Sequence, residues 1–334
     1  MTGVEHREVA PDDVGLRLDR WFKRHFPAVS HVQLEKLLRT GQVRIDGGRV
    51  KASARLEAGQ QIRVPPLRAA EGRSQAAQGR DREHDQRLSK DLQGMVFFEE
   101  KTFLAINKPA GLAVQGGTGT THHLDRLLAA HAAVHGEQLR LVHRLDRDTS
   151  GVMLLARSAN AAAALAELFR HRDVSKLYWA LTAGIPAQPR GRIDKALAKR
   201  ADAARGGREA MAIADADDDD SQRAVTDYAV MGHAGPIGWL ALRPVTGRTH
   251  QLRAHLASIN APIVGDRKYG GEASGIGGAI PAGLMLHARS ITLPAGFGER
   301  RNKPLILTAP AGGAMKEACG LLGFDVRNDT DPFD

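Results

Sequence analysis

The chain has little cysteine, few aromatic residues and no long apolar run. A single thiol, Cys319, in 334 residues cannot form an intrachain disulfide, so we expect a reducing, cytoplasmic setting. Aromatic residues make up 4% of the chain, so each one is worth locating. No apolar run approaches the ~20 residues that cross a bilayer. Residues 1–13 lack the apolar core of a signal peptide and are expected to be a tail or a short strand.

Positive charge is what the chain has in excess. The formal net charge is +9, which favours a polyanionic partner. The motif G-x-x-x-x-G-K-[ST] of a phosphate-binding loop is absent. The acidic run at 215–220 lacks the glycine and the spaced glutamate of a calcium loop. We therefore expect no cofactor and no metal site.

Most of the excess charge lies in residues 14–66, where eleven Lys or Arg face four acids. Apolar residues recur there at helical spacing in two segments. A short strand with an Asp46-Gly47 turn follows, and a closing strand ends the segment. This pattern predicts a small, basic α/β domain. Residues 67–92 are polar and poor in large apolar residues, which is typical of a linker.

Residues 93–334 alternate apolar strands with helical segments and predict a larger α+β domain. Its central feature is LVHRLDRDTSGVMLLA, residues 141–156, in which a polar connector precedes the buried strand 152–156. A second motif, GRTHQLRAHLASIN, predicts a helix over 248–258. The segment 187–222 has neither periodicity and is expected to be loop-like.

Asp146, in that connector, admits three interpretations from the residues alone. It can be one partner of a surface ion pair, which stabilises little. With Asp148 it can form the D-x-D of a Mg²⁺-dependent aspartyl phosphatase, although His143 and Arg144 interrupt the strand that such a site needs. It can also be a metal-free nucleophile or base beside an arginine.

The motifs of this domain resemble those of the RluA family of pseudouridine synthases, which isomerise uridine in structured RNA. HRLDRDTSG resembles the family's signature and is followed about 100 residues later by GRTHQLRAH, which matches without a gap. An NKP segment at 107–109 and a K-x-Y-x-A segment at 176–180 match the family's other motifs. The resemblance implies a central mixed, mainly antiparallel sheet flanked by helices.

The resemblance also assigns roles to five side chains. Asp146 is the catalytic carboxylate, and Arg253 pairs with it. Tyr178 stacks on the target base, and Arg144 contacts the flipped nucleotide or fills its place. Lys108 is a structural and electrostatic neighbour of the active site.

Residues 14–66 resemble the S4 RNA-binding domain, in which a helix pair grips phosphates. The expected phosphate contacts are Arg17, Lys36, Arg39 and Arg44.

The segment after NKP is most similar to the subgroup that modifies large-subunit (23S) ribosomal RNA, the RluC type. The partner implied is therefore ribosomal RNA, bound by a monomer with no membrane association. A non-catalytic S4-type ribosome-assembly factor is the alternative, and the phosphatase is a remote one.

Overall fold

The computed structural model describes residues 4–26, 29, 31–67, 75–116, 122–202, 208–215, 217–218, 220–275, 279–298, 302–327 and 330–333. The chain divides into two compact units, Met1–Arg80 and Asp81–Asp334. Residues 68–74 of the expected linker, and 216 and 219 of the acidic run, lie outside the described residues.

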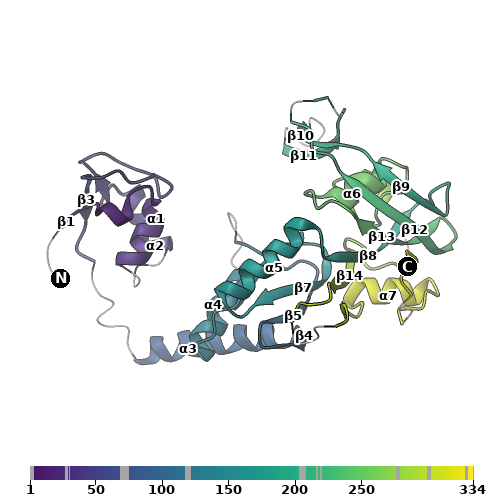
Figure 1. The fold of residues 1–334 in the computed structure, drawn as a ribbon, viewed down its shortest axis with the longest axis horizontal. Helices are drawn as coiled ribbons and strands as arrows, with labels where there is room; N and C mark the ends of the chain where they lie inside the picture. Colours follow the sequence, from purple (N-terminus) through teal and green to yellow (C-terminus); the bar gives the residue numbers. More distant parts are fainter. Residues whose placement is uncertain are drawn as a thin grey trace. The chain divides into compact units, whose positions relative to one another are not determined.

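The first unit is a small sheet packed by two helices (Figure 1). In chain order its elements are β1 (Glu5–Glu8), η1 (Pro11–Asp13), α1 (Leu18–His25), α2 (His31–Arg39), β2 (Arg44–Ile45) and β3 (Gln61–Val64). The strands are antiparallel in the order β1-β3-β2. Trp21 and Phe22 of α1 are 1% exposed in its core. The helical spacing of apolar residues in this segment was a correct guide to the first helix.

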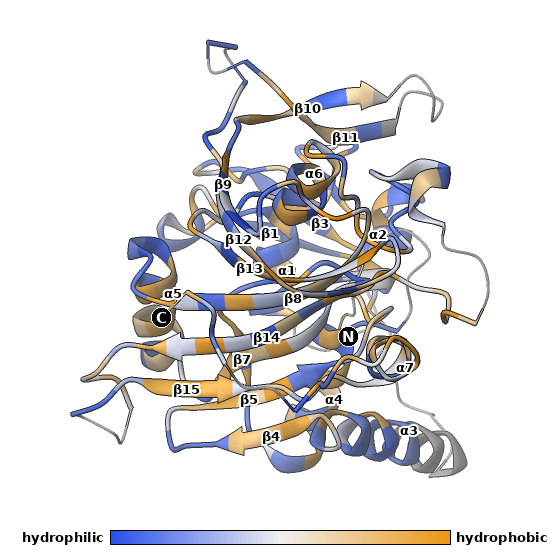
Figure 2. Ribbon diagram, turned by 90° about the vertical axis from the view of Figure 1, so that its right-hand side faces the viewer, coloured by the Kyte–Doolittle hydropathy of each residue, from blue (hydrophilic) through white to orange (hydrophobic). Residues whose placement is uncertain are grey.

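Helix α3 (Gln75–Gln93) occupies much of the segment expected to be a linker. Its described part is mostly hydrophilic (Figure 2). Leu88 and Leu92 are the exceptions, and both are buried in the core of the second unit. Two leucines at i, i+4 are enough to bring one face of a polar helix onto a core, so the end of this segment packs with the second unit.

The second unit is built on one large sheet. Its further elements, in order, are β4 (Val96–Glu99), β5 (Phe103–Lys108), α4 (Leu124–His135), β6 (Arg140–Leu141), β7 (Ser150–Ala156), α5 (Ala159–His171), β8 (Ser175–Ala183), β9 (Arg190–Asp194), β10 (Leu197–Asp202), β11 (Arg208–Ile213), β12 (Val225–Ala234), β13 (Ile237–Pro244), α6 (Gln251–Ala257), η3 (Gly271–Ser274), β14 (Leu286–Leu293), β15 (Leu305–Thr308) and α7 (Gly313–Leu321).

Ten of the described strands form that sheet, in the order β4-β5-β7-β14-β8-β13-β12-β9, with β15 on β14 and β6 on β7. The pair β7–β14 is parallel, and the other recorded pairs are antiparallel. The expectation of an α+β fold with a mixed, mainly antiparallel sheet is confirmed.

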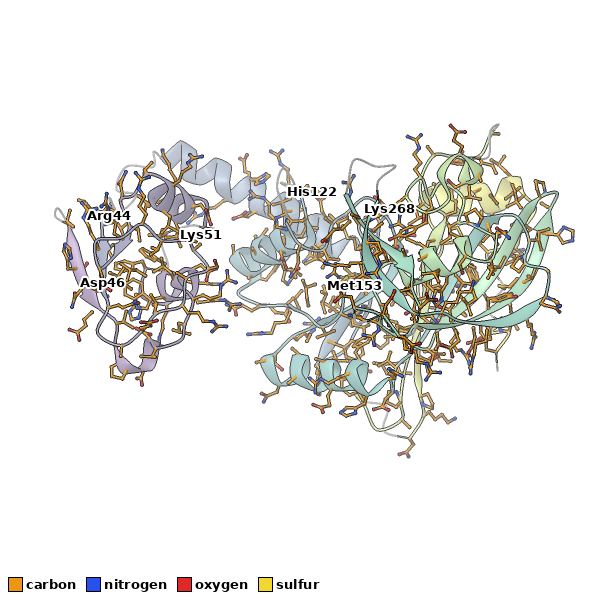
Figure 3. The ribbon with its side chains drawn as sticks, turned by 90° about the horizontal axis from the view of Figure 1, so that it is seen from above. Arg44, Asp46, Lys51, His122, Met153 and Lys268 are labelled. Carbon is orange, nitrogen blue, oxygen red and sulfur yellow. The ribbon has the colours of Figure 1, made fainter. Side chains whose placement is uncertain are left out.

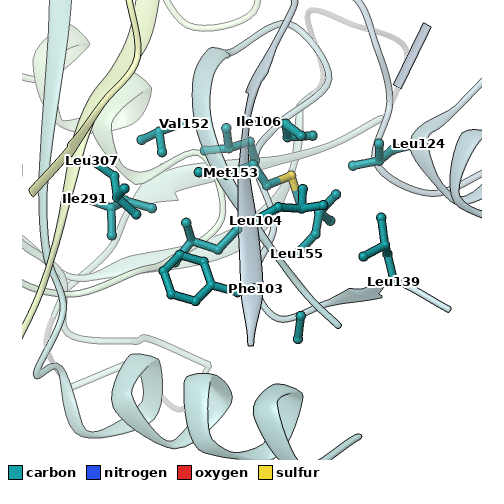
Figure 4. Close-up of a cluster of buried hydrophobic side chains, with 14 of the residues drawn as sticks. Phe103, Leu104, Ile106, Leu124, Leu139, Val152, Met153, Leu155, Ile291 and Leu307 are labelled. Atoms are coloured by element: carbon teal, nitrogen blue, oxygen red, sulfur yellow. The ribbon is translucent and has the colours of Figure 1, made fainter. Parts of the chain in front are cut away.

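The strand that follows Asp146 lies in the middle of the core. Residues 151–156 of β7 are all buried, and Val152, Met153 and Leu155 pack with β5 and β14 (Figure 4). Gly151 begins this buried run with φ +112°, and a Cβ there would lie 2.2 Å from the Ala288 carbonyl oxygen. The close parallel approach of β14 therefore requires glycine at this position of the DTSG motif.

The expectation of a loop over 187–222 is wrong. This segment holds β9 and the two strands of a hairpin, β10 and β11, which form a separate two-stranded sheet next to α6 (Figure 1). Its alanines and charged residues have low strand propensity, so backbone pairing and the packing of Met211 override the local pattern.

Helix α6 begins at Gln251, three residues later than predicted, because His250 before it has left-handed backbone angles (φ 53°, ψ 19°). None of the described helices is both long and apolar enough to span a membrane.

Candidate active site

A cleft of about 800 Å³ opens at the end of the central sheet. Its walls come from the loop that carries Asp146, the start of β8, the end of β13 and the GRTHQ segment that leads into α6. The cleft is strongly basic, because seven of the described lining residues are Lys or Arg and two are Asp. The basic side chains are those of Arg144, Arg170, Arg172, Lys176, Arg243, Arg248 and Arg253.

The loop around Asp146 is fixed from behind by Lys108. The Lys108 ammonium is fully buried and donates to the carbonyl oxygens of Pro109 (2.9 Å), Leu112 (3.0 Å) and Arg147 (3.0 Å). Burial lowers the pKa of Lys108 to about 8, against the opposing effect of Asp148 and Asp146. Lys108 does not line the cleft. It connects the end of β5 to the loop that carries Asp146.

Arg253 is held mainly by a carboxylate that the sequence reasoning did not single out. Its Nε and Nη2 donate to Asp266 Oδ2 and Oδ1, each at 2.7 Å. The remaining nitrogen, Nη1, lies 3.9 Å from Asp146 Oδ2. The structure thus brings Arg253 and Asp146 together as an ion pair, as the sequence predicts, and adds a second carboxylate partner that the sequence did not indicate. Asp266 is the bidentate partner, and the contact with Asp146 is longer than a hydrogen bond.

Asp266 is itself completely buried and held by the backbone. Its Oδ1 also accepts from the amides of Lys268 (3.1 Å) and Tyr269 (3.2 Å). It belongs to PIVGDRKYGG, a segment in which an acid directly precedes two basic residues. Nothing local marks it as a partner of an arginine 13 positions earlier.

The polar residues of the GRTHQLRAH motif divide into a scaffolding set and a cleft-facing set. The Gln251 side chain accepts from Thr246 Oγ1 (2.7 Å) and the Arg248 amide (3.0 Å), and donates to the Val225 carbonyl and Thr226 Oγ1. His255 contacts Thr226 Oγ1 and the Lys195 carbonyl oxygen. These bonds fix α6 against β12.

His250 is a cleft residue that the sequence reasoning also missed. Its Nε2 lies 3.8 Å from Asp146 Oδ2, and its Nδ1 lies 2.7 Å from the Tyr269 hydroxyl. Burial lowers the pKa of His250, an effect that Asp146 opposes and that Arg253 and Lys268 reinforce. Burial raises the pKa of Tyr269. The left-handed turn at His250 points its ring back at Asp146 just before the helix starts.

Tyr178 and Arg144 line the same cleft as Asp146. Tyr178 lies on β8 and is half-buried, whereas its neighbour Trp179 is fully buried in the core, as strand alternation requires. Burial, and then the charge of Asp146, raise the pKa of Tyr178, so its hydroxyl stays protonated.

Arg144 is exposed. Asp148, the second acid of D-x-D, is also exposed and lies 3.4 Å from Arg147.

The four expected phosphate contacts all lie in the first unit. Lys36 and Arg39 are exposed in the last turn of α2, and Arg17 is exposed and pairs with Asp19 at 2.7 Å. Arg44, labelled in Figure 3, is half-buried and donates to the carbonyl oxygens of Gly41 and Gly47.

Comparison with known proteins gives consistent matches. Residues 102–258 match the family described as RNA pseudouridylate synthase, and residues 16–62 match the S4 domain. The chain is 31% identical to "Ribosomal large subunit pseudouridine synthase C" of Buchnera aphidicola, over 88% of this chain and 90% of that protein. It is 32% identical to the protein of the same name from Escherichia coli, over 78% of both chains.

A solved structure also resembles this one. "Human RNA Pseudouridylate Synthase Domain Containing 4" has a TM-score of 0.58 and 29% identity, and the match covers 72% of this chain and 97% of that chain.

Proposed function

The chain belongs to the RNA pseudouridylate synthase family, and we propose that this RNA pseudouridine synthase acts on large-subunit ribosomal RNA with Asp146 as its catalytic carboxylate. The observation that carries the proposal is the position of Asp146. Its side chain is 22% exposed in a basic cleft, with Arg253 and His250 both within 4 Å. The relatives named for the ribosomal large subunit support the target.

The substrate uridine enters the cleft as a flipped nucleotide, because its reacting atoms are inaccessible within a stacked helix. Seven cationic side chains around the cleft suit the phosphates on either side of it. Tyr178, half-buried on β8, offers a ring on which the uracil stacks. Arg144 is exposed at the same wall and fills the place of the flipped base or contacts its phosphate.

Two routes fit a carboxylate in this position. In the first, Asp146 attacks C1′ and the C1′–N1 bond breaks, which releases the uracil as an anion. In the second, Asp146 removes the 2′ proton and the same bond breaks to give a glycal. In both, the uracil turns and C5 forms the new bond to C1′. This step displaces the Asp146 carboxylate from C1′ in the first route, and in the second route the 2′ proton returns to C2′. The C5 proton is then lost and N1 takes up a proton. The product has the mass of uridine, so no oxidant, phosphoryl donor or cofactor is consumed.

The S4 domain supplies sequence-independent affinity in this account. Its exposed Lys36 and Arg39 stand one helical turn apart on α2 and contact RNA phosphates. We propose residues 14–66 as the RNA-binding domain and the chain from Gln93 onward as the catalytic domain, acting as a monomer.

The target is tested by mapping pseudouridines in ribosomal RNA from cells with and without this protein. Carbodiimide labelling marks pseudouridine, and primer extension locates it. We expect one or a few large-subunit positions to lose their label and to regain it when the purified protein is added. Unchanged large-subunit labelling, with loss in another RNA, would contradict the target while leaving the enzyme class intact.

A further inference from the structure

His250 occupies an unusual place beside Asp146. Its backbone is left-handed at φ 53°, a region in which a bulky non-glycine residue carries strain. The ring that this backbone presents is 22% exposed and lines the cleft. It lies between the Asp146 carboxylate and the Tyr269 hydroxyl, and it contacts both with different nitrogens.

The partners on each side decide where the imidazole carries its proton. A neutral histidine has one N–H donor and one acceptor nitrogen, and burial favours that neutral form by lowering the pKa of His250. The Tyr269 hydroxyl already accepts from the Met211 amide at 3.2 Å, so its own proton is available to His250 Nδ1 at 2.7 Å. With Nδ1 as acceptor, the proton resides on Nε2 and faces the carboxylate. The opposite tautomer would set a lone pair against the negative charge of Asp146.

The side chains of His250 and Arg253 approach the same oxygen of Asp146. His250 Nε2 comes within 3.8 Å of Oδ2, and Arg253 Nη1 comes within 3.9 Å of Oδ2. Both distances exceed a hydrogen bond, as is common in catalytic sites without substrate. Because both side chains approach Oδ2, neither of these two contacts involves Oδ1.

We propose that His250 is a positioning residue for Asp146, held by Tyr269 as the Nε2–H tautomer so that Nε2 and Arg253 together bind Oδ2 and leave Oδ1 to react. The proposal rests on Asp146 as the catalytic carboxylate. It also gives a role to the β10–β11 hairpin, whose strand β11 holds the Tyr269 hydroxyl through the Met211 amide. Lys268, labelled in Figure 3, adds a second link, from its ammonium to the Glu209 carbonyl of β11 at 3.1 Å.

The test compares two amide substitutions of one residue in the full-length protein. The glutamine amide nitrogen reaches the place of Nε2, and the asparagine amide nitrogen reaches only the place of Nδ1. We therefore expect His250→Gln to keep kcat near the wild-type value. His250→Asn and His250→Ala should lose roughly 100-fold in kcat with KM for RNA unchanged.

A merely structural role predicts the reverse order, because asparagine tolerates left-handed backbone better than glutamine does. An asparagine variant as active as the glutamine variant, or more so, would overturn the proposal.

A spectroscopic measurement reads the tautomer without RNA. In the ¹⁵N-histidine spectrum, with the His250 signals assigned by their loss in His250→Gln, we expect an acceptor Nδ1 and a protonated Nε2. Tyr269→Phe should shift this equilibrium while the circular dichroism stays unchanged. A protonated Nδ1 in the wild-type protein would refute the inference. Because this reading needs no substrate, it stands even if the large-subunit target proves wrong.

Discussion

Arg253 gives two of its guanidinium nitrogens to Asp266, at 2.7 Å each, and turns the third toward Asp146 at 3.9 Å. Asp266 therefore fixes the orientation of the Arg253 guanidinium, and its remaining N–H group lies next to the Asp146 carboxylate. A planar guanidinium suits this arrangement, because its fork fixes the direction of the remaining N–H group. Asp266 does not line the cleft, but it fixes the orientation of Arg253, which does. We therefore expect substitutions of Asp266 to affect the site as strongly as substitutions of the lining residues.

Replacement of Asp266 by asparagine should affect both stability and catalysis. The Asp266 side chain is completely buried. Loss of its negative charge leaves the Arg253 guanidinium without its charged partner, at a cost of about 3–5 kcal/mol in unfolding free energy. We expect kcat to fall as well. Urea denaturation and a tritium-release assay on 5-tritiated RNA measure the two effects.

The double variant Arg253→Met with Asp266→Leu is the matched control. It removes both buried charges, so we expect much of the stability to return while activity stays lost. If activity returned together with stability, Arg253 would have only a packing role.

Tyr178 should contribute mainly through its ring. Tyr178→Phe keeps the stacking surface, so we expect KM for RNA to stay close to the wild-type value. Tyr178→Leu removes the stacked ring, and RNA binding should weaken by about 1–3 kcal/mol. Equal KM values for the two variants would show that the base does not stack on this residue. The kcat of Tyr178→Phe measures separately what the hydroxyl adds.

His143 should make the second unit sensitive to acid. Its Nε2 accepts from the Leu154 amide at 2.9 Å, and burial, reinforced by Lys176, lowers its pKa to about 3. Between pH 6.5 and about 3 the unfolded chain binds a proton at this residue that the folded chain does not. The stabilisation is therefore complete above pH 6.5 and is lost as the pH falls through that window.

His143→Gln keeps an acceptor near the position of Nε2 but cannot titrate. We expect its unfolding free energy to fall less steeply with acid, by up to about 1.4 kcal/mol per pH unit relative to the wild-type protein. If the unfolding free energies of the two proteins fell in parallel from pH 7 to 4, His143 would take up its proton at the same pH in the folded and the unfolded chain.

Removal of the charges of Lys36 and Arg39 should weaken RNA binding without changing its sequence preference. Both side chains are exposed on α2, where they suit phosphate contacts. In a plot of log affinity against log salt concentration, each loss of a phosphate contact should reduce the slope by roughly one. The measurement uses Lys36→Gln and Arg39→Gln in the full-length protein. A parallel variant, Arg172→Gln, removes an exposed charge of the cleft wall and serves as the comparison for the second unit. A slope unchanged in the α2 variants would remove them from the RNA interface.

The parts of the structure that the sequence predicts well are those with a local cause. The apolar run before Ala156 predicts a buried strand, and the motif at 150–156 folds as β7 with Gly151 where β14 comes too close for a side chain. The start of α5 is a local feature of the same kind, because the Ser158 hydroxyl accepts from the Ala161 amide.

What the sequence could not supply depends on contacts between distant segments. The partnership of Arg253 with Asp266 requires the turn after α6, and the contact of His250 with Tyr269 requires both that turn and a left-handed residue. The hairpin strands β10 and β11 have poor local propensity and are stabilised by pairing with each other. Long-range geometry of this kind leaves no periodic signal in the chain.

The most direct test of the account is Asp146→Asn, assayed for pseudouridine formation in large-subunit ribosomal RNA. The amide is nearly isosteric but is neither a nucleophile nor a base, so we predict that the variant folds, binds RNA with wild-type affinity and produces no pseudouridine. Retained isomerisation by the pure variant would contradict the central role assigned to this carboxylate.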